Sequence, residues 1–213
     1  HKQTGRFYGM EQISFFFEKA DRRLEAKAIL CGVGLSNAAA ATAWLIADGV
    51  DGVINEGLSG ALSGLHRGEA VLGERFYQYD FDATAFGYEL GQMCDEPYPF
   101  EGDNLLYRYF SSRYAHLKRG VLASANRFVS SEETKRFLCE KFGAVACDME
   151  SSAVALVCHK QSIPFVVIRE AADDAGEDAA EVYDQISGAV DGSVLSLVMD
   201  GVKGLLEYDA FFA

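Results

Sequence analysis

An uninterrupted apolar run, Ile163–Ile168, constrains the fold more than any other feature of the sequence. It is rich in β-branched residues and meets no polar residue before Arg169, so it predicts a strand buried on both faces. Shorter apolar runs at Gly52–Asn55 and Ala144–Cys147 alternate with helical segments. Buried strands that alternate with helices are typical of α/β proteins. We therefore expect a three-layer sandwich with a mixed, mostly parallel central sheet.

The other expected elements follow from caps, turns and periodicity. A hairpin is expected at Gln12–Val33, turning at Asp21–Arg23, and Ser36 can cap an alanine-rich helix, Asn37–Ala47. Gly57–Gly60 predicts a glycine-rich loop, which would let the backbone approach a ligand. The remaining expectations are a strand at Glu69–Tyr77, a loop at Tyr79–Phe100, a helix at Asp103–Tyr114, a strand at Gly120–Ser124, a helix with a Ser130/Glu133 capping box, a helix at Ser151–His159 and a long helix at Ala179–Leu206.

Composition limits the class of protein. The 213 residues are 49% hydrophobic and are not divided by any Pro-, Ser- or Gly-rich run, so we expect a single domain over residues 1–213. A net charge of −13 argues against nucleic-acid partners and anionic membranes, and no apolar stretch approaches the ~18 residues of a membrane span. The five cysteines show neither a zinc spacing nor a C-x-x-C pair. We expect a cytoplasmic protein without a bound metal.

Three acidic segments directly follow apolar strands. They are Asn55–Gly57, Asp148–Glu150 and Glu170–Asp174. In parallel sheets ligands bind where the carboxyl ends of strands gather, and a desolvated carboxylate there has a raised pKa that suits acid catalysis. The alternative interpretation is that these residues cap the helices that follow. The pattern alone leaves both interpretations open.

Four motifs in register give the sequence a family resemblance. They are Thr84–Gln92, Asp148–Glu150, Pro164–Arg169 and Asp173, and together they resemble the 5'-methylthioadenosine/S-adenosylhomocysteine nucleosidases of the nucleoside phosphorylase superfamily. The resemblance covers the chain from about Lys27 onward. It implies a nucleoside phosphorylase-like fold and hydrolysis of the N-glycosidic bond of 5'-thio-substituted adenine nucleosides, with water and without a cofactor.

The resemblance also implies roles for individual residues. Asp173 would protonate adenine N7, Glu150 would hold the ribose hydroxyls and Arg169 would lie near the water and the carboxylates. Phe86, with Tyr88, would reach the partner's site across a homodimer. The implied substrate-binding residues are Val33, Ser59, Phe86, Phe128, Val129, Met149 and Tyr183.

The chain departs from the family pattern at several positions. Family members begin with a strand leading to a water-activating glutamate, and we expect that segment to be missing here rather than supplied by Glu11. Ala172 replaces a serine that supports the catalytic aspartate, and Glu56 with Leu58 alters the glycine-rich loop. These departures leave two alternatives open: a related phosphorylase or other purine nucleosidase, and a catalytically impaired nucleoside-binding dimer.

Overall fold

The computed structural model describes residues 2–7, 9–186 and 193–212. Its main sheet has the strand order β6-β5-β7-β8-β4-β9, and an additional pairing of β5 with β9 closes five of these strands into a ring. The longer pairings, β4 with β9, β5 with β7 and β7 with β8, are parallel, and the shorter ones are antiparallel. The sheet is therefore mixed, as the sequence predicts. The strands are β4 (Val53–Ala61), β5 (Ala70–Gln78), β6 (Phe100–Glu101), β7 (Lys118–Ser124), β8 (Ala144–Asp148) and β9 (Phe165–Asp173).

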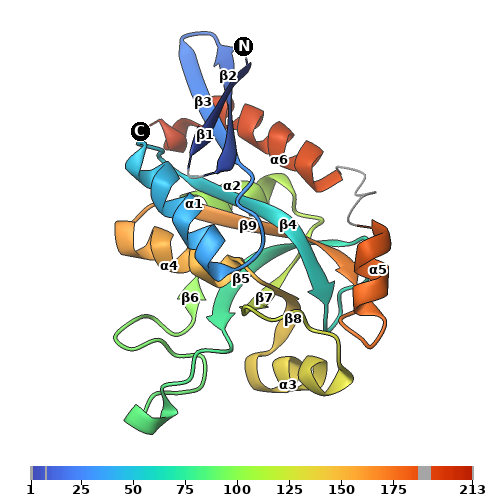
Figure 1. The fold of residues 1–213 in the computed structure, drawn as a ribbon. Coiled ribbons are helices and arrows are strands. Elements are labelled where there is room, and N and C mark those ends of the chain that lie inside the picture. The colour runs from blue at the N-terminus through green and yellow to red at the C-terminus, as the bar shows by residue number, and fades with distance from the viewer. Residues whose placement is uncertain (1, 8, 187–192, 213) are drawn as a thin grey trace.

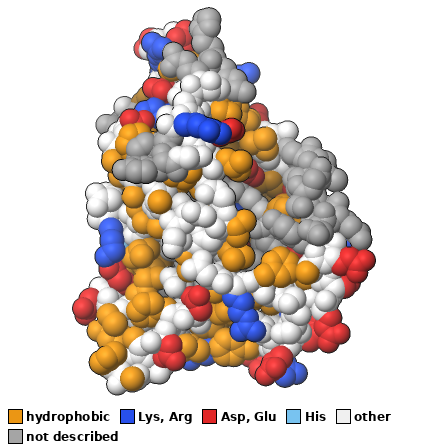
Figure 2. Space-filling model, in the orientation of Figure 1, with side chains coloured by type: hydrophobic (Ala, Val, Ile, Leu, Met, Phe, Trp, Pro, Cys, Tyr) orange, Lys and Arg blue, Asp and Glu red, His pale blue; other side chains and the backbone are white. Residues whose placement is uncertain are grey.

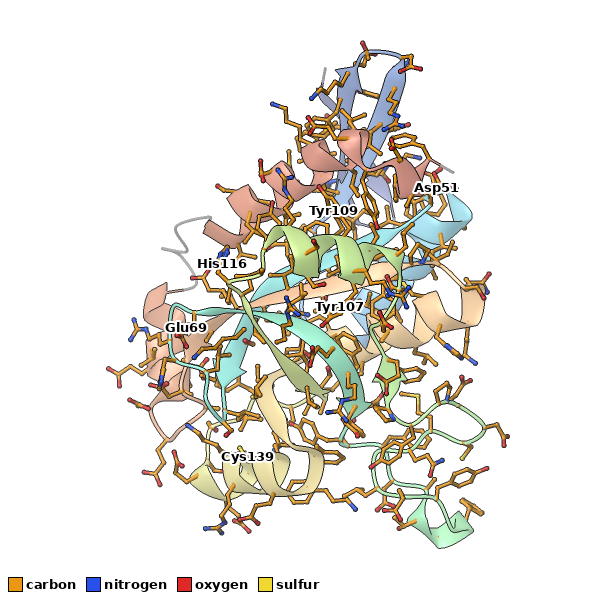
Figure 3. All side chains as sticks on the ribbon, turned by 180° about the vertical axis from the view of Figure 1, so that it is seen from behind. Asp51, Glu69, Tyr107, Tyr109, His116 and Cys139 are labelled. Atoms are coloured by element: carbon orange, nitrogen blue, oxygen red, sulfur yellow. The ribbon has the colours of Figure 1, made fainter. Side chains whose placement is uncertain are left out.

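Helices cover both faces of this sheet. In Figure 1, α1 (Leu35–Ala47) and α4 (Ser151–Gln161) lie on the side nearer the viewer. The opposite face carries α2 (Leu105–Arg113) and α6 (Ser193–Gly204), and Figure 3 shows it from behind, with the labelled Tyr109 of α2 near α6. The Tyr109 hydroxyl donates to the Gly201 carbonyl at 2.9 Å, which ties the two helices together. The three-layer arrangement agrees with the prediction. The remaining helices are α3 (Glu132–Phe142) and α5 (Ala179–Ile186), with short turns η1 (Thr84–Phe86), η2 (Leu205–Glu207) and η3 (Asp209–Phe211).

A separate antiparallel sheet stands at the N-terminal end of the molecule. It contains β1 (Lys2–Phe7), β2 (Met10–Lys19) and β3 (Arg22–Ile29) in that order, and it projects at the top of Figure 1. The predicted hairpin is therefore present, with its turn at Ala20–Asp21. Trp44 Nε1 of α1 donates to Gln12 Oε1 at 3.2 Å, and Lys27 pairs with Asp48 just beyond α1 at 2.5 Å. These contacts hold the hairpin against the main body.

Several element boundaries differ from the predictions. The predicted glycine-rich loop at Gly57–Gly60 is wrong, because these residues continue β4 in parallel pairing with β9. The predicted caps Ser36 and Ser130 are also wrong: α1 begins at Leu35, and Ser131 accepts the Thr134 N–H at the start of α3. Of the long helix predicted at 179–206, the structure describes α5 at Ala179–Ile186 and α6 at Ser193–Gly204, and residues 187–192 lie outside the described part of the chain.

The loop between β5 and β6 carries the most exposed large hydrophobic side chain among the described residues. Hydrophobic side chains gather at the lower left of Figure 2, over this loop. Phe86, in η1, is 81% exposed. Within the described ranges, none of the helices is long and apolar enough to cross a membrane.

Candidate functional site

A buried arginine organises the polar centre of the molecule. Arg169 lies on β9 and is 2% exposed. Its Nε donates to Asp148 Oδ2 at 2.7 Å, and its Nη2 donates to Asn55 Oδ1 at 2.7 Å. The same Nη2 lies 3.4 Å from Glu150 Oε2. Arg169 thereby joins β4, the end of β8 and the start of α4 in one network.

The glycine at position 57 makes room for this arginine. Gly57 lies beside Arg169 in the parallel register of β4 and β9. A Cβ at position 57 would come within 2.2 Å of Arg169 Nη1, far inside contact distance. A side chain larger than hydrogen would therefore displace the guanidinium from its partners.

Asp148 is held in its ionised form. Burial by itself would raise the pKa of this carboxyl, but the Arg169 guanidinium and the hydroxyls of Ser124 and Ser151 outweigh it and lower the pKa. The Ser124 hydroxyl donates to Asp148 Oδ1 at 2.6 Å, and the Ser151 hydroxyl donates to Oδ2. With its oxygens engaged in this way, Asp148 acts as the anchor of Arg169.

Glu150 links the network to the start of α1. Its Oε1 accepts the Gly34 N–H at 2.8 Å, and Asn126 Oδ1 accepts the Leu35 N–H at 2.8 Å. Both acceptors satisfy backbone donors that the first turn of a helix leaves free. Burial raises the pKa of Glu150, while the Arg169 charge opposes that rise. The second carboxylate oxygen, Oε2, faces Arg169 at the cavity wall.

Asp173 is the last residue of β9 and is 2% exposed. Burial raises the pKa of its carboxyl, and a 2.8 Å hydrogen bond from the Ala175 N–H to Oδ1 only partly opposes this. Its neighbour Asp174 is exposed. A buried carboxylic acid with a raised pKa, on the wall of a cavity, is suited to donate a proton near neutral pH.

A cavity of about 1110 Å³ brings most of the predicted site residues together. Phe128, 39% exposed, contributes to its wall together with the buried Val129. The catalytic and substrate-binding candidates on the wall are Val33, Ser59, Phe128, Val129, Met149, Glu150, Arg169 and Asp173.

Two predicted site residues are not part of this wall. Phe86 lies on the exposed loop instead, and the side chain of Tyr183 is outside the described residues. Glu11 lies on β2, where it forms an exposed ion pair with Arg6 at 3.7 Å. In the part of the chain that the structure describes, no group of His, Cys, Asp or Glu side chains is placed to hold a metal ion.

Sequence reasoning missed the residues that support the charged groups. Asn55 binds Arg169, Asn126 caps α1, and Ser124 and Ser151 bind Asp148. The one sequence feature that could have identified them is their position, because Asn55, Ser124 and Ser151 all lie on or just after buried apolar strands. Nothing in the local sequence indicated their partners.

Comparisons with known proteins cover nearly the whole chain. The model of the phosphorylase superfamily matches residues 15–198. A 5'-methylthioadenosine/S-adenosylhomocysteine nucleosidase from Shewanella loihica is 34% identical over 173 residues, which span 76% of this chain and 75% of that protein.

Solved structures show the same similarity. The 5'-methylthioadenosine/S-adenosylhomocysteine nucleosidase of Neisseria meningitidis, in complex with methylthio-immucillin-A, is 33% identical with a TM-score of 0.86 and covers 95% of this chain and 90% of its own. The S-adenosylhomocysteine nucleosidase of Streptococcus pyogenes, in complex with 5-methylthiotubericidin, is 27% identical with a TM-score of 0.88 and covers 96% and 88%.

Proposed function

Because the chain belongs to the phosphorylase superfamily and, within it, to the 5'-methylthioadenosine/S-adenosylhomocysteine nucleosidases, we propose that it hydrolyses the N-glycosidic bond of 5'-thio-substituted adenine nucleosides and releases adenine. The observation that carries this function is Asp173, a buried carboxylic acid with a raised pKa on the wall of the cavity. Asp173 and Glu150 line the same cavity, so one pocket holds both an acid and a sugar-binding carboxylate.

Asp173 acts as the general acid in this proposal. Its neutral carboxyl donates a proton to N7 of adenine, and the base leaves as a neutral molecule with the electron pair of the N-glycosidic bond. Water then forms the new C–O bond at the anomeric carbon and gives up a proton, which restores the acid. A positioned acid of this kind contributes about 10²–10⁴ in rate. The Ala175 N–H holds Oδ1 of Asp173 and supplies part of the orientation that the alanine at position 172 cannot provide.

Glu150 binds the sugar. Its Oε2 faces Arg169, and its carboxylate stabilises the oxocarbenium character that develops on the ribose as the bond breaks. Met149 packs against the sugar, Phe128 stacks on the adenine and Val129 offers backbone groups to the base edge. Val33 and Ser59 complete the wall, and Tyr183 would lie beside the 5' substituent. No cofactor takes part in these steps.

Hydrolysis is favoured over phosphorolysis by the charges around the sugar. A phosphate would need a cation that is free to bind it. Arg169 already binds Asp148 and Asn55, and Glu56 on β4 adds negative charge to the cavity wall. At Arg169, phosphate would therefore meet an unfavourable site.

Assembly and cellular context complete the proposal. The 81% exposed Phe86 and its loop would form a two-fold contact in a homodimer, because an apolar side chain this exposed is poorly suited to water. The enzyme would work in the cytoplasm, in methionine salvage. Size-exclusion chromatography with light scattering tests the dimer, and Phe86→Ser is expected to shift it toward the monomer.

Release of free base tests the activity directly. The protein is incubated separately with methylthioadenosine, adenosylhomocysteine, inosine and futalosine, with and without phosphate, and the products are separated by chromatography. We expect adenine from the first two substrates at rates that do not depend on phosphate. A ribose 1-phosphate product would establish the phosphorylase alternative, and nucleoside binding without any cleavage would establish the binding-protein alternative.

A further inference from the structure

The peptide group that joins Asp174 to Ala175 forms a hydrogen bond at each end. Its N–H donates to Asp173 Oδ1 at 2.8 Å. Its carbonyl oxygen accepts a hydrogen bond of 2.5 Å from the ammonium group of Lys135, on α3. A single peptide group therefore connects a cation on α3 to the carboxyl that the proposed function assigns as the acid.

The turn that contains this peptide group is buried and is supported by α3. Ala175 is 0% exposed, and its φ of 52° lies in the left-handed region that favours glycine. An alanine keeps this conformation only where the surrounding contacts hold it. α3 lies beside the turn in Figure 1 and supplies two of these contacts. They are the hydrogen bond from Lys135 and the carboxylate of Glu132, whose Oε1 lies 3.1 Å from the place of an added Cβ at Gly176.

The turn also fits closely against β4. An added Cβ at Gly60 would lie 3.0 Å from the Cβ of Ala175 and 3.2 Å from Asp173 Oδ1. Both distances are too short for a side chain to be inserted without displacing the turn or the carboxyl. The direction of the Asp173 carboxyl therefore depends on the exact position of the turn, and Lys135 helps to hold that position.

The charge of Lys135 acts on Asp173 in the same direction as the hydrogen bond from Ala175. The titratable and charged groups that face the Asp173 carboxyl are Cys147 of β8, Lys135 of α3, and Asp174 and Asp178 in the segment after β9. Burial is the main cause of the raised pKa of Asp173, and the two neighbouring aspartates add to it, whereas the Ala175 N–H and the Lys135 ammonium lower it. The Cys147 thiol stays neutral, because burial raises its pKa. A peptide carbonyl bound to a cation also makes the N–H of the same peptide a stronger donor.

We propose that Lys135 is a positioning residue for the acid: its ammonium holds the Asp174–Ala175 peptide so that the peptide N–H directs the Asp173 carboxyl into the cavity. Lys135 does not line the cavity, so it acts through Asp173 and not on the nucleoside. Loss of its ammonium would loosen the carboxyl and strengthen its hold on the proton, since both the cation and the N–H favour the ionised form. This role rests on the proposed function.

The titration of Asp173 tests the role of Lys135 without any assay of activity. The carboxyl carbon is observed by ¹³C NMR in the free protein, and its signal is identified by its absence in Asp173→Asn. In Lys135→Met the carboxyl should bind its proton about threefold more tightly, less than the roughly tenfold or more expected on loss of a direct ion-pair partner. The midpoint then moves to higher pH. Lys135→Arg, which keeps the charge, should titrate like the wild type.

Arg136→Met is the matched control. It removes an exposed cation from the next residue of the same helix, so it should leave the midpoint of Asp173 unchanged. If Lys135→Met does not fold, Lys135→Gln takes its place. Lys135→Gln keeps a hydrogen-bond donor but loses the charge, and it should move the midpoint in the same direction by a smaller amount.

The kinetics of adenine release give a second readout. Lys135→Met should lower kcat about 5–50-fold, because a misdirected acid transfers its proton less effectively, while KM stays within about twofold. The alkaline limb of the pH profile of kcat should move to higher pH, and Lys135→Arg should recover most of kcat.

Two results would overturn the role of Lys135. One is a Lys135→Met variant in which Asp173 titrates as it does in Arg136→Met. The other is a lower kcat with an unmoved alkaline limb, because the lysine would then only stabilise α3. If the wild type releases no adenine, the proposed function fails, and the NMR comparison still decides whether Lys135 positions Asp173.

Discussion

Asp148 and Asp173 occupy equivalent places in the fold but differ in their surroundings. Each is the last residue of a strand, β8 or β9, and they are 7% and 2% exposed. Asp148 is bound by a guanidinium and two hydroxyls, and its pKa is lowered. Among the described residues, no cationic side chain forms an ion pair with Asp173, and its carboxyl accepts one backbone N–H. Burial therefore raises its pKa. Burial at the end of a strand therefore does not determine the role of a carboxyl; its partners do.

Removing the acid should have the largest effect. Asp173→Asn keeps the size of the side chain but cannot donate the proton, so kcat should fall about 10²–10⁴-fold while nucleoside affinity stays within about tenfold. Stopped assays of adenine release, with affinity from calorimetry, measure both quantities. Asp174→Asn, at the exposed neighbour, is the matched control. If Asp174→Asn were the inactive variant, the assignment of the acid would be wrong by one residue.

Removing Asp148, which anchors Arg169, should lower the free energy of unfolding rather than kcat. Asp148→Ala leaves the Arg169 guanidinium buried without its main counter-charge, and breaking a buried pair in this way costs about 3–5 kcal/mol in the free energy of unfolding. Urea denaturation measures this loss. The exposed pair of Asp103 with Arg108 is the control, and Asp103→Ala should leave the urea midpoint unchanged.

A double variant sharpens the same comparison. Asp148→Ala combined with Arg169→Met removes both charges, so it should be more stable than Asp148→Ala alone. A double variant that is less stable than the single one would show that Arg169 contributes mainly through its packing and not through its charge pair with Asp148.

Displacing Arg169 without changing its charge should have an intermediate effect. The methyl group of Gly57→Ala would collide with Nη1, and such overpacking costs about 1–3 kcal/mol. Because Arg169 also orients Glu150, kcat/KM should fall as well. Gly5→Ala on β1 is the control, since an added Cβ there meets nothing within 4 Å. Equal behaviour of the two variants would contradict the tight fit around Arg169.

The two aspartates should change the pH dependence of the free energy of unfolding in opposite directions. This effect should be smaller than those of the substitutions described above. The lowered pKa of Asp148 contributes stability above the ordinary aspartate pKa, and this is lost as pH falls through the folded-state value. The raised pKa of Asp173 has the opposite effect, and its contribution is lost as pH rises through the folded-state value.

Urea titrations at a series of pH values from about 3 to about 8 should show this difference, because carboxyl groups titrate within this range. Asp173→Asn should gain on the wild type as pH rises, by about 1.4 kcal/mol for each tenfold change in proton affinity. A gain that is independent of pH would indicate that Asp173 is ionised throughout and cannot serve as the acid.

Much of the fold could be predicted because its signals are local. The apolar run before Arg169 indicated β9, and the alternation of strands with helices indicated the layers. The helix caps were harder to predict, because the capping side chains come from residues far away in the sequence. Glu150 and Asn126 bind the first N–H groups of α1, although they lie 116 and 91 residues from their donors. No local sequence pattern encodes such contacts, and the prediction of Ser36 as the cap was wrong for this reason.

The candidate site shows the same contrast between features that the local sequence indicates and features that depend on distant partners. The position of a carboxyl at the end of a strand is visible in the sequence, but the sign of its pKa change is not. Asp148 and Arg169 are 21 residues apart and meet because β4 places their strands in register on either side of it. The sequence around Gly57 likewise predicted a ligand-binding loop, and this prediction was wrong. Gly57 lies in β4, at a point where the side chain of Arg169 passes close to the backbone.

The double pairing of β9 has a consequence for how the molecule adapts to a ligand. β4 holds one edge of β9 along its length, and β5 holds the other edge from Ile168 to Glu170. A strand bonded on both edges opens only in large, cooperative unfolding events, so Asp173 is presented from one of the most rigid parts of the chain. The segment Leu30–Val33 is mostly exposed and has no regular structure, so we expect the protein to adjust there. Ligands of different size would therefore be accommodated by this segment, while the acid keeps a fixed place.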